Sequence, residues 1–460
     1  MRRENEFRYL KLANILREQI LSGFIKPGEF LMSENELCKY YGMSRTSVRK
    51  SLEQLLQEGL IVKKVGQGTI VSNDVVPNPT QNKVLRIFAI SPSHFHDIGM
   101  PIIVEEFQKE NPNVEVKFLP LAASDYWDSV DTSKELGLQP DLLYIYDRPY
   151  ALIEDFQQFA DMEVPSGEDF APLYPRLLNA FSPEGRLKAM PVTFSTVFLA
   201  YNPELFRQYG VPEPTESWTK EDFLRTAKRL TMDTNGDGIP DIYGLSLPIS
   251  LSRWPVIALQ NGINFKAPDL GLLTGTFRFL HELLYIHRVA LLSPRDVLNS
   301  EAFIRGKAAM VLTTSIEIAG WANQEMRFAP KVAPLPFGDR KDTMLIANSF
   351  MIPRDSSEPE LARQFVQKAI QPAVQEKISR NTEFISVLPS VNEAIRSPAL
   401  LKSLHIHRDV IANSYFSHEL FRDVNLFDEM EAEMFLYWAG LYSADEIARH
   451  MQRILSGQAD

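Results

Sequence analysis

Two short helices separated by a glycine turn are the feature that most restricts the fold of this chain. Ser33 and Glu36 have the spacing of a capping box, which predicts that a helix begins here and ends at Gly42. Ser44 then caps the next helix. The residues expected on the inward face of that helix are Val48, Leu52, Leu55 and Leu56. Two short helices joined by a tight turn predict a helix-turn-helix in this part of the chain.

Flanking patterns complete this first unit. Residues 9–20 have the apolar spacing of an earlier amphipathic helix. Residues 60–62 and 69–71 alternate as short strands, with Gly66-Gln67-Gly68 at the tip of a hairpin. A β-ribbon after a helix-turn-helix predicts a winged helix-turn-helix of the α+β class over residues 1–74.

Charge is distributed unevenly between this unit and the rest of the chain. Residues 1–74 contain 12 Lys and Arg against 9 Asp and Glu, a net charge of +3. The whole chain carries −11, so the remaining residues carry −14. A basic head on an acidic body favours a polyanionic partner for the head alone.

A different pattern begins after a connecting segment. Residues 75–83 hold two prolines and no periodicity, which predicts a short linker. Beyond it, strand-like runs such as 84–90 and 141–146 alternate with amphipathic helices. This alternation predicts an α/β fold with a mainly parallel sheet over residues 84–460.

Four motifs follow one another within residues 31–71: SENEL, GMSRTSVR, EGLI and GQGT. In this order and spacing they resemble the DNA-binding domain of the GntR (gluconate-repressor) family of bacterial transcription regulators. The resemblance implies a winged helix-turn-helix that binds double-stranded DNA as part of a homodimer.

The body carries four further motifs: MPVTFSTVFLAYNPELFRQYGV, ESWTKEDFLRTAKRLTMDTNGDGIPDIYG, EAFIRGKAAM and AGLYSADEIARHMQRIL. They resemble the family 1 extracellular solute-binding proteins, the maltose-binding type of ABC-import receptor. The resemblance implies a two-lobed α/β body of the type II periplasmic-binding-protein class. A receptor of that family would begin with a secretion signal, whereas a DNA-binding domain stands in that place here.

The candidate DNA contacts lie on the third helix and in the wing. Arg45 and Arg49 are four residues apart and therefore share one face, and arginine matches guanine edges and phosphates. The full set of expected DNA contacts is Ser44, Arg45, Thr46, Arg49, Lys50 and Gly66. Relatives usually have arginine at the position of Asn35, so a contact there is not expected.

The candidate ligand contacts lie where strands end. Asp147 and Tyr150 follow one predicted strand and Ser91 follows another, at the edge where open α/β sheets place ligands. The resemblance to solute-binding receptors implies further contacts, at Trp254, Trp321 and Asn348. Tryptophan also serves as a packing residue, and this alternative stays open. The expected ligand is a small solute of the carbohydrate class, a mono- or oligosaccharide.

One loop has the spacing of a cation site. In DTNGDGIPD the oxygen donors Asp233, Asn235, Asp237 and Asp241 occupy positions 1, 3, 5 and 9, which suits calcium. The twelfth position is Gly244 and not the glutamate of an EF-hand. The alternative is a polar loop whose side chains bond to their own backbone. The sequence therefore requires no cofactor and admits a structural calcium ion.

Composition limits the remaining classes. With 45% hydrophobic and 23% charged residues, the chain is typical of a folded soluble protein. It has no run near the roughly 18 apolar residues that a membrane span requires. The first residues do not have the pattern of a secretory signal, and the single Cys38 cannot form an internal disulfide. We therefore expect a cytoplasmic protein without a membrane partner.

These patterns predict a multidomain, ligand-responsive transcription regulator that binds an operator and a small effector. No catalytic constellation is recognised, so the chain is not expected to be an enzyme. The competing interpretation is a sugar-binding receptor of an ABC importer without a regulatory role.

Overall fold

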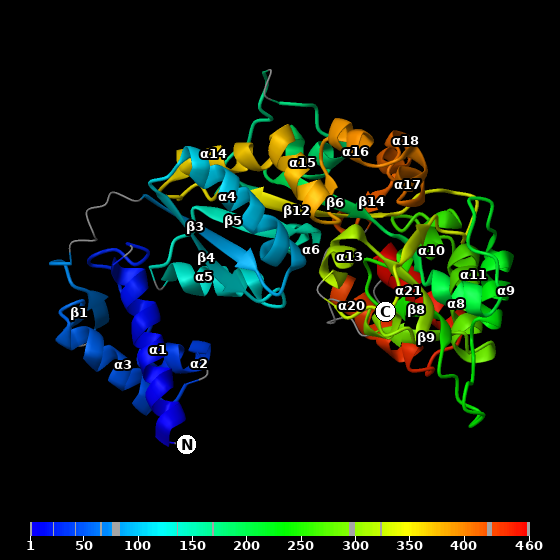
Figure 1. Cartoon of the computed structure of the whole chain (residues 1–460), viewed down its shortest axis with the longest axis horizontal. Helices are drawn as coiled ribbons and strands as arrows, with labels where there is room; N and C mark the ends of the chain where they lie inside the picture. Colours follow the sequence, from blue (N-terminus) through cyan, green and yellow to red (C-terminus); the bar gives the residue numbers. More distant parts are fainter. Residues whose placement is uncertain are drawn as a thin grey trace.

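The computed structural model shows a small helical head beside a larger body of two lobes (Figure 1). It describes residues 2–21, 23–41, 43–64, 67–75, 83–135, 137–167, 170–293, 300–322, 324–420 and 426–457. Among the helices in these ranges, none has both the length and the apolar character needed to cross a membrane.

The head consists of three helices and a hairpin. Its elements are α1 (Arg2–Leu21), α2 (Glu34–Tyr41), α3 (Arg45–Gln57), β1 (Ile61–Lys64) and β2 (Gly68–Val71). The two strands pair in antiparallel register. This order confirms the predicted winged helix-turn-helix.

Local hydrogen bonds explain where the two short helices begin. The Ser33 N–H donates to Glu36 Oε2 at 2.7 Å, and the Glu36 N–H donates to Ser33 Oγ at 3.3 Å. This reciprocal pair confirms the predicted capping box. Ser44 Oγ accepts the Ser47 N–H at 3.3 Å, so α3 begins where the sequence predicts.

The inward face of α3 differs from the prediction at one residue. Val48, Leu52 and Leu55 are buried, whereas Leu56 is 40% exposed. Successive residues of an α-helix are rotated by about 100°, so Leu55 and Leu56 cannot both point into one narrow core.

The first lobe is built on a seven-stranded sheet. Six of its strands are hydrogen-bonded in the order β13-β6-β12-β5-β3-β4, and β14 pairs with β12. Their bounds are β3 Lys83–Ile90, β4 Val114–Leu121, β5 Leu142–Tyr146, β6 Met190–Thr196, β12 Met344–Met351, β13 Ile385–Ser386 and β14 Tyr415–Phe416. β3 lies next to the edge strand β4, and β4 and β5 are parallel to it on either side.

The second lobe is built on a five-stranded sheet in the order β11-β7-β10-β8-β9. The bounds are β7 Phe198–Tyr201, β8 Tyr243–Pro248, β9 Ala290–Ser293, β10 Ala308–Thr313 and β11 Lys331–Ala333. Its buried side chains form a hydrophobic cluster separate from that of the first lobe.

The prediction of a mainly parallel sheet is wrong for both lobes, since β7 of the second lobe is antiparallel to both β10 and β11. In the first lobe, β12 is antiparallel to both β5 and β6, and β13 is antiparallel to β6. The reason is that β12 re-enters the first lobe from the second, and so it does not arrive through a strand-helix-strand crossover.

Adjacent crossing segments join the lobes. The chain passes from β6 to β7 through the single residue Val197, and it returns through Thr343 into β12. The Val197 N–H donates to the Met344 carbonyl at 3.0 Å, and Thr343 Oγ1 donates to the Val197 carbonyl at 2.7 Å. The two crossing segments are therefore bonded to each other.

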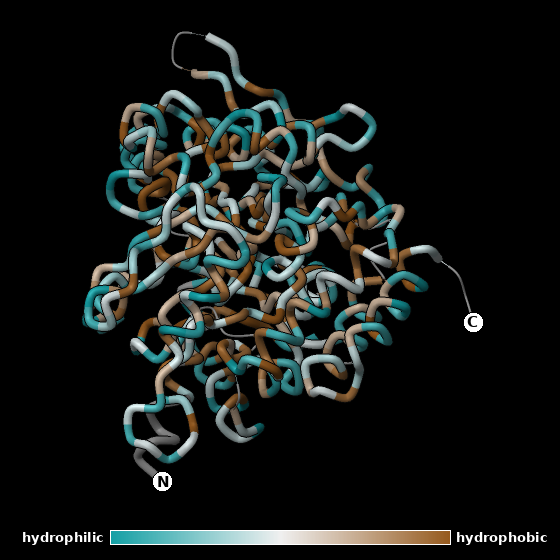
Figure 2. The backbone as a smooth tube through the Cα atoms, turned by 90° about the vertical axis from the view of Figure 1, so that its right-hand side faces the viewer, coloured by the Kyte–Doolittle hydropathy of each residue, from teal (hydrophilic) through white to brown (hydrophobic). Residues whose placement is uncertain are grey.

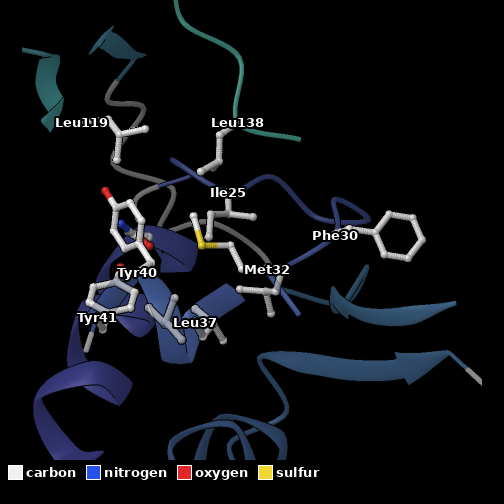
Figure 3. A pocket seen from close by; sticks show the side chains of 11 residues that line it. Ile25, Phe30, Met32, Leu37, Tyr40, Tyr41, Leu119 and Leu138 are labelled. Atoms are coloured by element: carbon white, nitrogen blue, oxygen red, sulfur yellow. The ribbon is translucent and has the colours of Figure 1, made fainter. Parts of the chain in front are cut away.

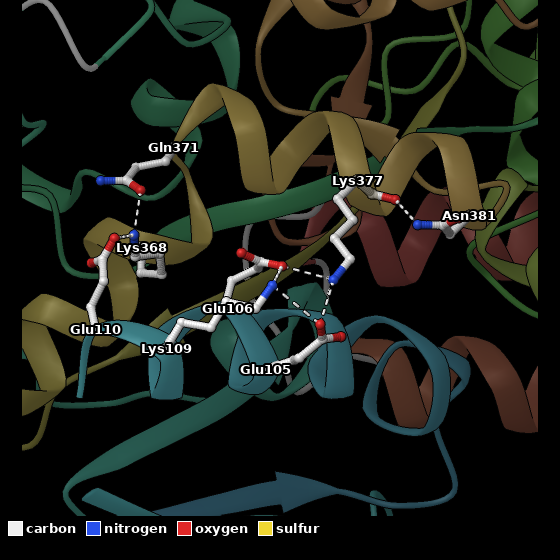
Figure 4. A network of polar contacts seen from close by, with 8 residues as sticks. All are labelled: Glu105, Glu106, Lys109, Glu110, Lys368, Gln371, Lys377 and Asn381. Atoms are coloured by element: carbon white, nitrogen blue, oxygen red, sulfur yellow. Dashed lines mark hydrogen bonds and ion pairs between the residues drawn. The ribbon is translucent and has the colours of Figure 1, made fainter. Parts of the chain in front are cut away.

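Helices cover the sheet of the first lobe. They are α4 Met100–Glu110 (preceded by a π-helical turn, η1 Phe95–Gly99), α5 Tyr126–Glu135, α6 Asp147–Ala151, α7 Pro175–Ala180, α14 Pro359–Ala369, α15 Pro372–Asn381, α16 Pro389–Ile395, α17 Pro398–Ser403, α18 Arg408–Asn413 and α19 Ser417–Leu420. Lys377 on α15 pairs with Glu105 and Glu106 on α4 at 2.9 and 2.7 Å (Figure 4). Lys368 on α14 reaches Glu110 at 2.5 Å, so both helices are tied to α4.

The helices of the second lobe include the end of the chain. They are α8 Pro203–Gln208, α9 Lys220–Arg229, α10 Pro255–Gln260, α11 Leu270–His281 (continued by a π-helical turn, η4 Glu282–Ile286), α12 Glu301–Ile304, α13 Ser315–Trp321, α20 Leu426–Trp438 and α21 Ala444–Ser456. Ser443 and Glu446 form a capping box at the start of α21. Figure 2 shows hydrophilic residues on the outer turns and many hydrophobic ones inside the body.

A buried histidine near the crossing segments makes the stability depend on pH. His405 Nε2 accepts the Leu335 N–H at 2.8 Å, and the side chain is buried. Burial, with the nearby Lys341 charge, lowers the pKa of His405 to about 4. The imidazole must be neutral to accept this hydrogen bond.

We predict that the free energy of unfolding falls by roughly 3 kcal/mol as the pH is lowered from about 6.5 to about 4 through this group alone. In that window the unfolded chain binds a proton that the folded chain does not. Urea titrations between pH 7 and 4 should show a smaller slope for His405→Gln than for wild type. The exposed neighbour variant His407→Gln is the control, and an equal slope in all three proteins contradicts the prediction.

Candidate functional site

The N-terminal end of α3 presents the predicted DNA contacts on one exposed surface. Arg45, Thr46, Arg49 and Lys50 are exposed, and the intervening Ser47 and Val48 are buried. Ser44, the helix cap, is exposed beside them. The structure thus brings five of the six predicted residues together, while Gly66 lies outside the described residues.

Two of these cationic side chains interact with neighbouring residues of the head. Arg49 Nε donates to Glu34 Oε2 at 2.7 Å, and this carboxylate raises the pKa of Arg49. Lys50 Nζ lies 5.5 Å from the centre of the Tyr9 ring. Glu34, in the first turn of α2, was not predicted as part of this surface, and its bond to Arg49 places it there.

Charged side chains from both lobes converge where the lobes meet. Asp147 begins α6 at the end of β5, in the first lobe, and Arg253 follows β8 in the second. Glu317 lies on α13, which follows β10. Both Glu317 and Asp147 raise the pKa of Arg253 through their charges, against a larger lowering by burial. Two carboxylates and one guanidinium therefore share one electrostatic environment.

Asp147 is the buried acid of this cluster. Ser417 Oγ donates to Asp147 Oδ2 at 2.5 Å, and the carboxylate is 3% exposed. Burial raises its pKa, and the Ser417 hydroxyl, His418 and Arg253 oppose that rise. A carboxyl in this position can accept or donate hydrogen bonds, which is the chemistry that recognises hydroxyl groups.

The carboxylate of Glu317 is held in place by several hydrogen bonds. Its carboxylate accepts the Ser300 N–H and hydroxyl at 2.7 and 2.6 Å, and the Thr313 hydroxyl at 2.7 Å. Its own N–H is capped by Thr314 Oγ1 at 3.2 Å. These bonds fix the position of the Glu317 carboxylate.

Asn348 is engaged within the first lobe. Tyr144 Oη donates to Asn348 Oδ1 at 2.7 Å, and Asn348 Nδ2 donates to Thr193 Oγ1 at 2.8 Å. Ser93 Oγ lies 2.8 Å from Tyr144 Oη, so the network reaches the segment after β3. Burial raises the pKa of Tyr144, which keeps its hydroxyl protonated as a donor.

The other four predicted ligand residues make contacts within their own lobes. Trp254 packs against Phe277 in the core of the second lobe, with ring centres 5.6 Å apart. Trp321 packs against Phe303 at 5.2 Å. Tyr150 packs against Phe181, Phe156 and His418, and the Ser91 N–H donates to the Leu121 carbonyl at 2.9 Å. All three aromatic rings pack against other rings, while Nε1 of Trp254 and of Trp321 is buried without a hydrogen-bond partner among the described residues. Ligand contact by these residues stays a prediction.

Sequence reasoning missed Arg253 and Glu317. Arg253 directly precedes the predicted Trp254, and Glu317 lies four residues before the predicted Trp321 on the same helix face. The sequence signal for these two residues was a charged side chain close to each predicted tryptophan. The structure shows that the aromatic ring of each pair is buried in a core.

Helix α13 of the second lobe contacts the first lobe at two points. A Cβ atom added to Gly320 on α13 would lie 2.1 Å from Cε1 of His94, which follows β3. Only glycine permits this approach of α13 to the first lobe. The Ser315 N–H, at the start of α13, also donates to Ser195 Oγ of β6 at 2.8 Å.

The loop with cation-site spacing bonds to its own backbone. Asp233 accepts the N–H groups of Gly236 and Gly238 at 2.6 and 2.7 Å, and Asp241 accepts the Thr234 N–H at 2.8 Å. Asn235 and Asp237 accept N–H groups two residues further on. In the described part of the chain, no three His, Cys, Asp or Glu side chains are grouped to hold a metal. Calcium binding there stays a prediction.

Comparisons with protein families agree with this architecture. Residues 103–403 match the family described as bacterial extracellular solute-binding protein. Residues 8–71 match the gntR family of bacterial regulatory proteins. The first match spans more than half of the chain.

Relatives with curated descriptions match through the head. The mannosyl-D-glycerate transport/metabolism system repressor MngR of Escherichia coli is 38% identical over 68 residues, which is 15% of this chain and 28% of that protein. The arabinose metabolism transcriptional repressor of Geobacillus stearothermophilus is 33% identical over 97 residues, 21% of this chain and 26% of that protein. The chain thus spans half or less of the length of such relatives.

Solved structures match through the body. An ABC substrate-binding protein from Listeria monocytogenes, in complex with cycloalternan, aligns with a TM-score of 0.67 and 21% identity, covering 82% of this chain and 98% of that one. UgpB from Mycobacterium tuberculosis, in complex with glycerophosphocholine, aligns with a TM-score of 0.67 and 16% identity, covering 81% and 97%. At such identities the likeness establishes the fold. The chain therefore belongs to the bacterial extracellular solute-binding protein family and carries a GntR-family winged helix-turn-helix at its N-terminus.

Proposed function

We propose that the protein is a ligand-responsive transcription regulator, in which the winged helix binds operator DNA and the two-lobed body senses a small solute. The observation that carries this proposal is one chain with both parts: a recognition helix with an exposed cationic end, and a body whose charged cluster draws on both lobes. A receptor of an importer makes no use of the first part. We therefore prefer the regulator.

The proposed DNA contacts are the residues on the exposed end of α3. A helix that lies in the major groove reads base edges with its N-terminal residues, and Arg45 and Arg49 occupy that place. Ser44, Thr46 and Lys50 can reach phosphates. Specific operators of this type are read as paired half-sites, so we propose a homodimer acting in the cytoplasm.

The proposed effector is a carbohydrate. Two named relatives of the head are repressors of arabinose and mannosyl-D-glycerate systems, and several structural neighbours of the body hold saccharides. Asp147, Arg253 and Glu317 supply the charged partners that polyhydroxylated ligands require. A ligand held between the lobes favours their closed arrangement by its differential affinity for that state.

We predict that Arg45→Ala and Arg49→Ala each weaken operator binding by about 1–3 kcal/mol, or roughly 5- to 150-fold. The operator can be obtained by selecting duplexes from a random pool with the wild-type protein, and binding is then measured by titration. Footprinting should protect two half-sites about one helical turn apart. Unchanged binding by both variants contradicts the recognition role of α3, and protection of a single half-site contradicts the dimer.

Glu34→Gln is predicted to strengthen DNA binding by up to about fivefold. Arg49 would no longer have to give up its ion pair with Glu34, and exposed pairs of this kind are worth about 0–1 kcal/mol. The effect should shrink in Arg49→Ala, since the same pair is then already absent. Glu163→Gln, an exposed change of equal charge on the body, is the control.

Binding of a saccharide is predicted to stabilise the full-length protein and to change its operator affinity. A panel of arabinose, maltose and maltotriose is screened by thermal unfolding, because a ligand at a hundredfold excess over its Kd adds about 2.7 kcal/mol. Saturation should change operator affinity by roughly 5- to 150-fold. Asp147→Asn should reduce the thermal shift and the exposed Asp125→Asn should not. A ligand that binds tightly without changing operator affinity contradicts the regulatory proposal.

A further inference from the structure

Arg86 connects the head to the first lobe. It belongs to β3, the central strand of the parallel part of the sheet, and its side chain is only 4% exposed. Arg86 Nε donates to the Phe24 carbonyl at 2.9 Å, and Nη2 donates to the Gly23 carbonyl at 2.5 Å. Both carbonyls belong to the head, just beyond the C-terminal end of α1. A buried arginine on a strand of the body thus donates hydrogen bonds to the backbone of the head.

The electrostatics of this contact depend on the head. The guanidinium lies 5.6 Å from the centre of the Phe24 ring, and it faces the negative end of the α1 dipole. A buried guanidinium requires hydrogen-bond partners. Its backbone is fixed as well, because the Arg86 N–H donates to Asp141 Oδ2 at 2.9 Å. Asp141 is buried and also accepts the Ser357 and Glu358 N–H groups.

Apolar residues continue the same contact. Leu119 and Leu138 of the first lobe face Ile25, Met32 and the tyrosines of α2 around a small cavity of about 20 Å³ (Figure 3). This volume is near that of one water molecule, so the surfaces are closely packed. Buried hydrophobic residues of the head and of the first lobe form one continuous cluster, whereas most of the second lobe's buried hydrophobic residues form another.

The docked head leaves α3 available. The contact with the lobe is made by the end of α1, by α2 and by the segment between them. Arg45, Thr46, Arg49 and Lys50 stay exposed. In Figure 1, α1 and α2 lie toward the body and α3 lies on the side away from it.

We propose that this contact, with Arg86 as its clamp, makes the head and the first lobe one rigid unit in a state that can bind DNA. The connecting segment 75–83 then serves as a covalent link and does not set the orientation of the head. The docking part is independent of the proposed regulatory function, and only the DNA part depends on it.

A designed disulfide tests the docking. A Cβ atom on Gly137 would lie 3.8 Å from Glu29 Cβ, which is the separation found across disulfides. The φ of +82° at Gly137 makes a cysteine there strained, so the unfolding temperature of the reduced variant is measured first. The double variant Glu29→Cys/Gly137→Cys, in a Cys38→Ser background that removes the natural thiol, is oxidised with glutathione disulfide. Rapid formation of the intramolecular bond is expected, and its absence in protein of native unfolding temperature overturns the proposal.

Arg86→Ala in the same background should slow this bond by about tenfold or more, the effect of losing charged hydrogen bonds. Arg380→Ala, an exposed arginine on α15 of the same lobe, is the control. Small-angle X-ray scattering without the added cysteines supplies a second measurement, in which Arg86→Ala should have a larger radius of gyration. Equal rates and equal radii in wild type and Arg86→Ala overturn the clamp.

Lengthening the connecting segment distinguishes two explanations for the position of the head: a direct contact with the lobe, or the short connection alone. About ten Gly/Ser residues inserted after Asn78 would slow disulfide formation roughly threefold if only the tether held the head near the lobe. The contact predicts an unchanged rate, and a threefold loss overturns it.

The DNA part uses a 30-base-pair duplex of mixed sequence at low salt as the probe. The oxidised, locked protein should bind it within about twofold of the reduced protein, because α3 stays exposed. Loss of binding on oxidation, restored by dithiothreitol, overturns the DNA-competent state while leaving the docking intact. Failure of the wild-type protein to bind DNA at all would count against the proposed function, not against the docking.

Discussion

The hydrogen bonds that join Val197 to Thr343 and Met344 hold together two lobes with largely separate hydrophobic cores. Each lobe is rigid because its own side chains are closely packed, and relative movement is left to the few residues that cross between them. The charged cluster of Asp147, Arg253 and Glu317 draws on both lobes. Its geometry therefore depends on the crossing segments more than on either lobe alone.

The contact between head and body determines how a movement of the lobes would affect the recognition helix. If Arg86 fixes the head to the first lobe, any rotation of the first lobe relative to the second rotates the recognition helix by the same angle. A direct contact of this kind transmits rotation more faithfully than a nine-residue connection with two prolines would, because its side chains are buried and hydrogen-bonded.

Local signals in the sequence were sufficient for the head. The capping pair Ser33 and Glu36, the cap Ser44 and the hairpin alternation each depend on residues within a few positions, and the structure confirms all three. Even Leu56 follows from helix geometry, although the sequence prediction placed it inside.

The body depends on pairings that no local pattern contains. Arg86 lies in a run that predicts a buried strand, and nothing nearby in the sequence indicates that Gly23 and Phe24 accept its hydrogen bonds. Arg253 and Asp147 are 106 positions apart and come from different lobes. The re-entry of β12 between β5 and β6 is likewise a consequence of the two crossings. Trp254 and Trp321 were predicted from the resemblance to solute-binding receptors, and both are buried, so ligand contact there stays a prediction.

A rigid head and first lobe also restrict how a dimer can respond to ligand. If two copies associated through their first lobes, closure would move the second lobes and leave the spacing of the heads unchanged. The spacing of the heads changes only if the surface that joins the two copies moves relative to the first lobe. A surface on the second lobe meets this condition. Because a ligand acts only through the difference in its affinity for the two states, the coupling then equals the free energy by which closed lobes favour one head spacing over the other.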